Sequence, residues 1–109
     1  MIKQICDIIW EVAVNNPDGF TVDLHGLPIT KGFSVGFKET QNSFGRQGLE
    51  RCVEHAIKHN AAIGGWKTPE GLQFDSVAIV REKSEAIRLG AENEQYSIYD
   101  LNTQTEIRI

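Results

Sequence analysis

The sequence has no long hydrophobic run and only 2 cysteines and 3 prolines in 109 residues. No apolar stretch approaches the roughly 20 residues that a membrane-spanning helix requires. Acidic residues at Asp7 and Glu11 interrupt the apolar N-terminal stretch, so it is not expected to be a secretion signal and belongs to the fold. We therefore expect a cytoplasmic protein without membrane contact.

The sequence also lacks a cluster of basic residues. Its 11 Lys+Arg and 15 Asp+Glu give a net charge of −4, and the basic residues are spread singly along the chain. Proteins that bind nucleic acids gather basic side chains on one face, because neutralising phosphates supplies most of their affinity. A nucleic-acid partner is therefore not expected.

Length and hydrophobic pattern predict a single α+β domain over residues 1–109. Apolar residues at spacings of three and four predict helices over 2–15, 46–60 and 82–92. Alternating apolar residues predict strands over 20–24, 33–37, 62–66, 72–80, 96–101 and 105–109. The order is helix, strand, strand, three times, and the short turns favour a mainly antiparallel sheet with the helices packed on it in two layers. The order of strands in space stays open.

The predicted core combines one stripe of the second helix with the large aromatic residues. The helix positions expected to face the sheet are Leu49, Val53, Ala56 and Ile57. Those expected to face water are Glu50, Glu54 and Lys58. An aromatic platform for stacking bases normally accompanies a basic groove, which is missing here. The aromatic residues therefore expected in the core are Trp10, Trp66, Tyr96 and Tyr99.

Several short strings resemble, as a set, uncharacterised small proteins of bacteriophages, conjugative elements and other mobile DNA of gut bacteria. The strings occupy residues 19–22, 40–44, 64–66, 74–76, 91–95 and 97–101. The resemblance extends over most of the chain from Gly19 onward. It implies an accessory protein of a mobile element in the bacterial cytoplasm, and it transfers no catalytic residue.

The strongest candidate for metal or nucleophilic chemistry is the series Cys52, His55 and His59 on the second predicted helix. These side chains fall within about 60° of one another around the helix and could share a metal with His25. The alternative is that Cys52 borders the apolar stripe while both histidines lie on the solvated flank. No Cys-x-x-Cys pair or zinc-finger spacing is present, so we expect no metal or cofactor. Both Cys52 and Cys6 are expected to be buried free thiols.

Three strand carboxylates, Asp23, Asp75 and Asp100, could serve acid–base chemistry if the sheet brought two of them together. The alternative is that they face outward or cap turns.

The loop from Glu39 to Gly45 is the best candidate for a binding site. It carries hydrogen-bonding groups, an aromatic side chain and a following helix N-terminus with free amides. The candidate binding residues are Thr40, Gln41, Asn42, Ser43 and Phe44. A hydrogen-bonded turn, with Ser43 as helix cap and Phe44 packed, is the structural alternative. The turn over 68–71 could extend this surface.

These observations favour a non-enzymatic accessory or adaptor protein of a mobile element that acts by binding another protein. Inhibition of a host defence is one specific form of that function. Two alternatives remain: a small metal-binding protein or enzyme that uses Cys52, His55 and His59, and a structural homo-oligomer. Solution mass and metal content distinguish the three.

Overall fold

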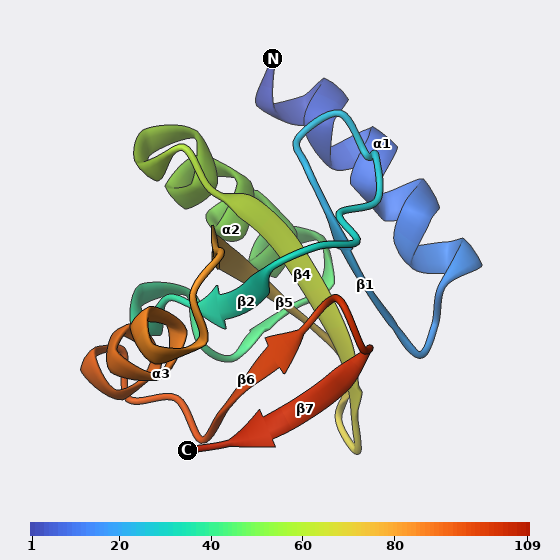
Figure 1. Ribbon diagram of the computed structural model, residues 1–109. Helices are drawn as coiled ribbons and strands as arrows, with labels where there is room; N and C mark the ends of the chain where they lie inside the picture. Colours follow the sequence, from blue (N-terminus) through green and yellow to red (C-terminus); the bar gives the residue numbers. More distant parts are fainter.

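The structure, a computed structural model, describes all residues from 1 to 109 and has an α+β fold (Figure 1). The helices are α1 (Ile2–Asn15), α2 (Gly45–His59) and α3 (Lys83–Glu92), with a short 3-10 helix, η1 (Lys38–Thr40). The strands are β1 (Gly19–Val22), β2 (Phe33–Gly36), β3 (Ser43–Phe44), β4 (Ala62–Thr68), β5 (Gly71–Val80), β6 (Ser97–Asp100) and β7 (Thr105–Arg108). Every predicted helix and strand is present, while η1 and β3 form in the segment predicted as a polar loop. None of the helices has the length and apolar character needed to cross a bilayer.

All seven strands form one curled antiparallel sheet in the order β1-β4-β5-β2-β6-β7, with β3 paired to β5. The hairpins β4–β5 and β6–β7 join chain neighbours, whereas β1 and β2 do not pair with each other. Residues 23–32 instead carry the chain from β1 at one edge to β2 between β5 and β6. The predicted threefold repeat of a helix and a strand pair is therefore not confirmed as a structural unit.

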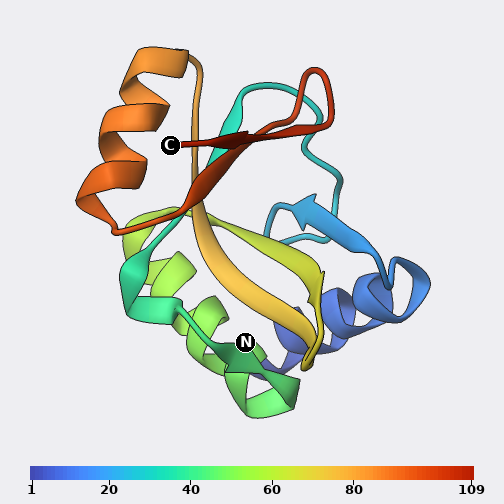
Figure 2. The same ribbon diagram turned by 90° about the horizontal axis from the view of Figure 1, so that it is seen from below.

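Two hydrophobic cores lie on the same face of the sheet. Side chains alternate along β5, and Phe74, Ala78 and Val80 are separated by even numbers of residues, so they point to the same face. Phe74 belongs to the first core and Val80 packs against the second. The first core packs α1 and α2 against β1, β4 and β5. Its buried members are Cys6, Ile9, Ala13, Val22, Leu49, Cys52, Val53, Ala56, Ile63 and Phe74. The second core, under α3, consists of Phe33, Val35, Ala86 and Ile98. Figure 2 shows α3 with the β6–β7 hairpin on one side of the molecule and α1 with α2 on the other.

The predicted stripe of α2 is confirmed except at one position. Leu49, Val53 and Ala56 are fully buried, and the three predicted solvent-facing residues are exposed. Ile57 is 39% exposed, contrary to the prediction. It lies eight residues after Leu49, about 80° around the helix, which places it at the margin of the buried stripe.

The prediction that four aromatic residues lie in the core is wrong. Trp10, Trp66, Tyr96 and Tyr99 are all exposed, Tyr96 by 86%. Trp66 pairs with Gln73 on the sheet face opposite the helices, and Tyr99 alternates with the buried Ile98. The alternation of side chains along a strand decides which face of the sheet Trp66 and Tyr99 occupy, so both rings are exposed although they are largely apolar.

Candidate functional site

A shallow apolar groove lies between α1, the start of α2 and the turn that joins β4 to β5. It has a volume of about 300 Å³. Its walls are formed by Trp10, Ala13, Val14, Phe44, Gly45, Glu70, Gly71, Leu72 and Phe74. These residues come from three segments far apart in the sequence. The groove therefore joins the predicted binding loop to the turn over 68–71, and adds α1, which sequence reasoning did not include.

The contribution of α1 comes from a second, exposed stripe of that helix. Trp10 and Val14 are one helical turn apart, and Val14 is 62% exposed. The Trp10 ring lies 6.0 Å from the Phe74 ring, between centroids. The guanidinium of Arg46 lies 5.9 Å from the centroid of the same indole ring, and Arg46 also pairs with Asp7. The indole is thus held at the groove by two contacts, one with Phe74 and one with Arg46.

Phe44 contributes to the lining of the groove from the segment before α2. It forms β3 with Ser43, pairs with Gln73 of β5 and immediately precedes α2. The chain turns into β3 at Asn42, which has a φ of 60°. Phe44 is half-buried and is one of the residues that line the groove.

The other four candidate binding residues do not line this groove. Thr40 and Ser43 are buried, and the Ser43 hydroxyl donates to the Thr40 carbonyl at 2.7 Å. Gln41 is half-buried and Asn42 is exposed at the turn. The predicted Ser43 cap is not found, because Phe44 occupies the N-cap position and no side chain caps α2. These polar residues hold the loop in shape, and Phe44 is the only one of the five that lines the groove.

Apart from the groove, a polar cluster on the flank of α2 places a serine, a histidine and a carboxylate in line. His55 Nδ1 lies 2.8 Å from Ser76 Oγ, and its Nε2 lies 3.1 Å from a Glu39 carboxylate oxygen. This order suggests a hydrolase triad. However, Ser76 is 0% exposed, and its backbone N–H donates to the Thr40 hydroxyl. A substrate has no access to this hydroxyl, so the cluster fastens α2 to β5.

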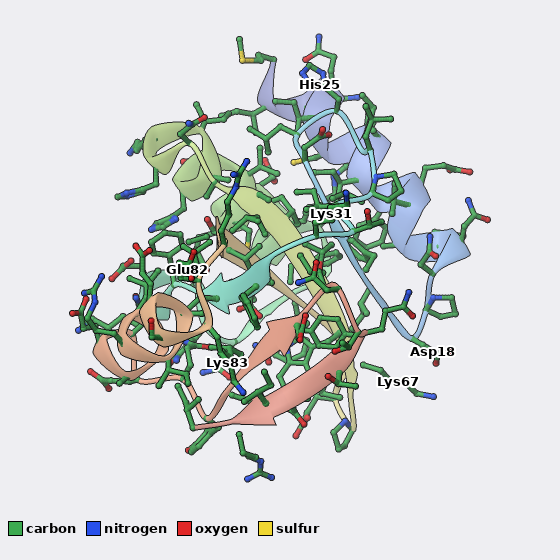
Figure 3. All side chains as sticks on the ribbon, viewed as in Figure 1. Asp18, His25, Lys31, Lys67, Glu82 and Lys83 are labelled. Carbon is green, nitrogen blue, oxygen red and sulfur yellow. The ribbon has the colours of Figure 1, made fainter.

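The three candidate metal ligands on α2 are not brought together. His55 and His59 stack with ring centroids 4.1 Å apart, but Cys52 is fully buried in the first core. Burial raises the pKa of the Cys52 thiol to about 11, so the thiolate that a metal or a nucleophilic mechanism requires is disfavoured. His25 lies in the loop beside α1 (Figure 3). No group of three or more His, Cys, Asp or Glu side chains has the geometry to hold a metal ion.

The strand carboxylates are also separated. A carboxylate oxygen of Asp23 accepts backbone N–H bonds from His25 and Leu27, and Asp100 caps the β6–β7 turn in the same way. Asp75 lies in the middle of β5 opposite Gly64. Burial raises the pKa of Asp75 to about 7, against hydrogen bonds from Gln73 and Trp66 that lower it. It has no second carboxylate beside it to complete an acid–base pair.

Comparison with known proteins gives no match to a family model, to a curated protein or to a solved structure. The resemblance to mobile-element proteins therefore stays a prediction.

Proposed function

We propose that this protein is a non-enzymatic binding domain that holds a segment of a partner protein in the groove between α1, Phe44 and the β4–β5 turn. The observation that carries the proposal is the meeting of Trp10, Val14 and Phe44 with Gly71 in one apolar depression. Protein interfaces depend on a few large apolar or aromatic anchors in such depressions, with polar groups around them.

The walls of the groove indicate the chemistry of the partner segment. Most lining residues are apolar, which suits one large apolar side chain from the partner. Glu70 is exposed at the rim and takes part in none of the ion pairs of the structure. A Lys or Arg next to the apolar anchor would meet this carboxylate. We therefore propose an exposed partner segment with a large apolar residue flanked by a basic one.

The resemblance to mobile-element proteins extends this proposal to an accessory protein whose partner belongs to the host, including a host defence protein that it inhibits. The groove would serve that function without a catalytic residue. The enzyme alternative has weaker support, because Ser76 and Cys52 are both fully buried.

The test is selection from a random peptide library displayed on phage, followed by affinity measurement with fluorescently labelled peptides. We expect enrichment of a large apolar residue beside Lys or Arg. Val14→Asp should weaken binding by about 30-fold, the loss typical of an interface anchor. Leu27→Asp is the matched control, because Leu27 is 61% exposed, close to the 62% of Val14, and lies outside the groove.

Phe44→Ala is measured for melting temperature and peptide affinity together. Lost affinity with retained stability supports an anchoring role, and lost stability places Phe44 in the core. The proposal is refuted if no peptide is enriched, or if enriched peptides bind Val14→Asp as tightly as the unchanged protein.

A further inference from the structure

The two edges of the sheet differ in how they are protected. Along β1 the outer side is covered by the loop that follows, because the Ile29 N–H donates to the Thr21 carbonyl and Pro28 bridges to Val22. The other edge, β7, pairs with β6 and with no further strand (Figure 1). Proteins protect such an edge by covering it, with proline, with charged side chains or by keeping the strand short, since open edges pair with other chains. β7 is uncovered and contains no proline, and its protection is limited to its length of 4 residues and the charges of Glu106 and Arg108.

The register of the β6–β7 ladder shows which main-chain groups of β7 are free. The Ile109 N–H donates to the carbonyl of Tyr96, which continues the ladder beyond the strand. Because hydrogen-bonded pairs alternate in an antiparallel ladder, the main-chain groups of Thr105 and Ile107 also face β6. Those of Glu106 and Arg108 therefore point outward, away from the sheet.

The side chains of these two residues are complementary to a second copy of the same strand. If two β7 strands pair antiparallel with Ile107 opposite Ile107, each Glu106 lies opposite Arg108 of the second copy. The outward main-chain groups of both residues then form hydrogen-bonded pairs on either side of the twofold axis. Arg108 has no acidic partner within its own chain, and Glu106 accepts a hydrogen bond from the Ser97 hydroxyl at 2.7 Å.

Neighbouring registers are disfavoured by the same charges. Shifting the strands so that the axis passes Glu106 places the two Glu106 side chains opposite each other. The opposite shift pairs the two Arg108 side chains. Like charges directly opposite in a ladder are destabilising, so the arrangement centred on Ile107 is selected among the registers that use the outward groups.

We propose that two copies of this chain associate through β7, in an antiparallel pair centred on Ile107, to form one continuous sheet. The half-buried Ile107 side chains meet across the axis on the face that α3 covers, and so extend the second core. The contact between four-residue strands is small, so the dimer is weak, with a dissociation constant in roughly the micromolar range or above.

The test is sedimentation velocity of the 12.2 kDa chain over a wide concentration range at low salt. The unchanged protein should form a concentration-dependent dimer. Glu106→Arg and Arg108→Glu should each weaken it by at least tenfold, because each variant places like charges opposite each other. Glu82→Arg is the control: it changes the net charge as Glu106→Arg does, at an exposed position outside β7 (Figure 3), and should leave the dimer intact.

Two recovery experiments separate pairing in this register from a general effect of charge. A mixture of the two single variants should form a heterodimer, since both charge pairs become attractive again. The double variant that exchanges the two charges should recover the homodimer. A protein that stays monomeric at every concentration overturns the proposal, and so do single variants that dimerise normally or mixtures that fail to recover the dimer. Circular dichroism of each variant confirms that it is folded.

Discussion

The region built on α1 and α2 and the region built on α3 share one sheet but differ greatly in what they bury. The first holds ten buried core residues and the second four. The first region is also closed by two helices that contact each other, whereas the second is covered by the single helix α3, which packs on β2, β6 and the end of β5 (Figure 2). Because buried apolar area supplies most of the folding free energy, the first region dominates the stability of the whole chain. The second depends on its attachment through β2 and leaves its edge strand free for association.

The largest expected effect comes from core cavities placed in each region. Leu49→Ala should lower the free energy of unfolding by about 2–5 kcal/mol, since Leu49 is fully buried between α2 and the sheet. Ile98→Ala should lower the free energy of unfolding by about 2 kcal/mol, because its neighbours Leu89 and Ile107 are only partly buried and can relax into the space. Urea denaturation measures both.

Glu50→Ala, at an exposed site on the same helix as Leu49, serves as the control and should change stability by less than about 0.5 kcal/mol. If Ile98→Ala proved more costly than Leu49→Ala, the second region would be the dominant one and the comparison would be reversed.

A smaller effect is expected from the buried carboxyl on the other face of β5. Burial raises the pKa of Asp75 to about 7, so the folded chain holds this proton more tightly than the unfolded chain. The stability that the protonated Asp75 carboxyl contributes is present at acidic pH, and it is lost as the pH rises from about 4 through 7. Asp75→Asn removes the charge. Its free energy of unfolding should rise by about 1–3 kcal/mol relative to that of the unchanged protein between pH 5 and pH 8. Thermal melts across this range measure the gain.

Asp7→Asn provides the matched control for that pH series. Hydrogen bonds, the stronger from Arg46 and the weaker from Lys3, hold the pKa of Asp7 below its usual range. Asp7 is therefore ionised in both the folded and the unfolded chain from pH 5 to 8. The difference in stability between Asp7→Asn and the unchanged protein should therefore stay constant with pH. A constant difference for Asp75→Asn as well would show that Asp75 is ionised in the folded protein.

The smallest effects are expected from the exposed ion pairs on the helices of the two regions. Lys3–Asp7 on α1 and Arg88–Glu92 on α3 both join residues four apart, with the basic residue first. This orientation is the less favourable one with respect to the helix dipole. Lys3→Ala and Arg88→Ala should each cost less than about 0.5 kcal/mol in urea titrations. A cost above about 1 kcal/mol in one helix alone would show that this region relies on surface charge.

Local patterns predicted the helices and hairpins because their determinants are near in sequence. The α1 stripe and the Pro69 and Gly71 turn signals each act within a few residues. The pairing of β1 with β4 was not predictable, because nothing in residues 19–22 specifies a partner so far along the chain. For the candidate site, Phe44 and the turn over 68–71 were named, but Trp10 and Val14 were not. Their place in the groove depends on how α1 packs against α2, which one sequence does not reveal.

The crossed strand order has a consequence for how the chain folds as it is synthesised. Residues 19–22 find their partners at 63–66, and residues 33–36 find theirs at 77–80 and 99–100. Neither β1 nor β2 can therefore gain a sheet partner until the middle of the chain has left the ribosome. Contacts so distant along the chain raise the contact order, and chains of that kind fold more slowly than chains whose contacts are mostly local. During that interval the apolar face of α1 is exposed without its sheet, and the nascent protein is then most prone to aggregation.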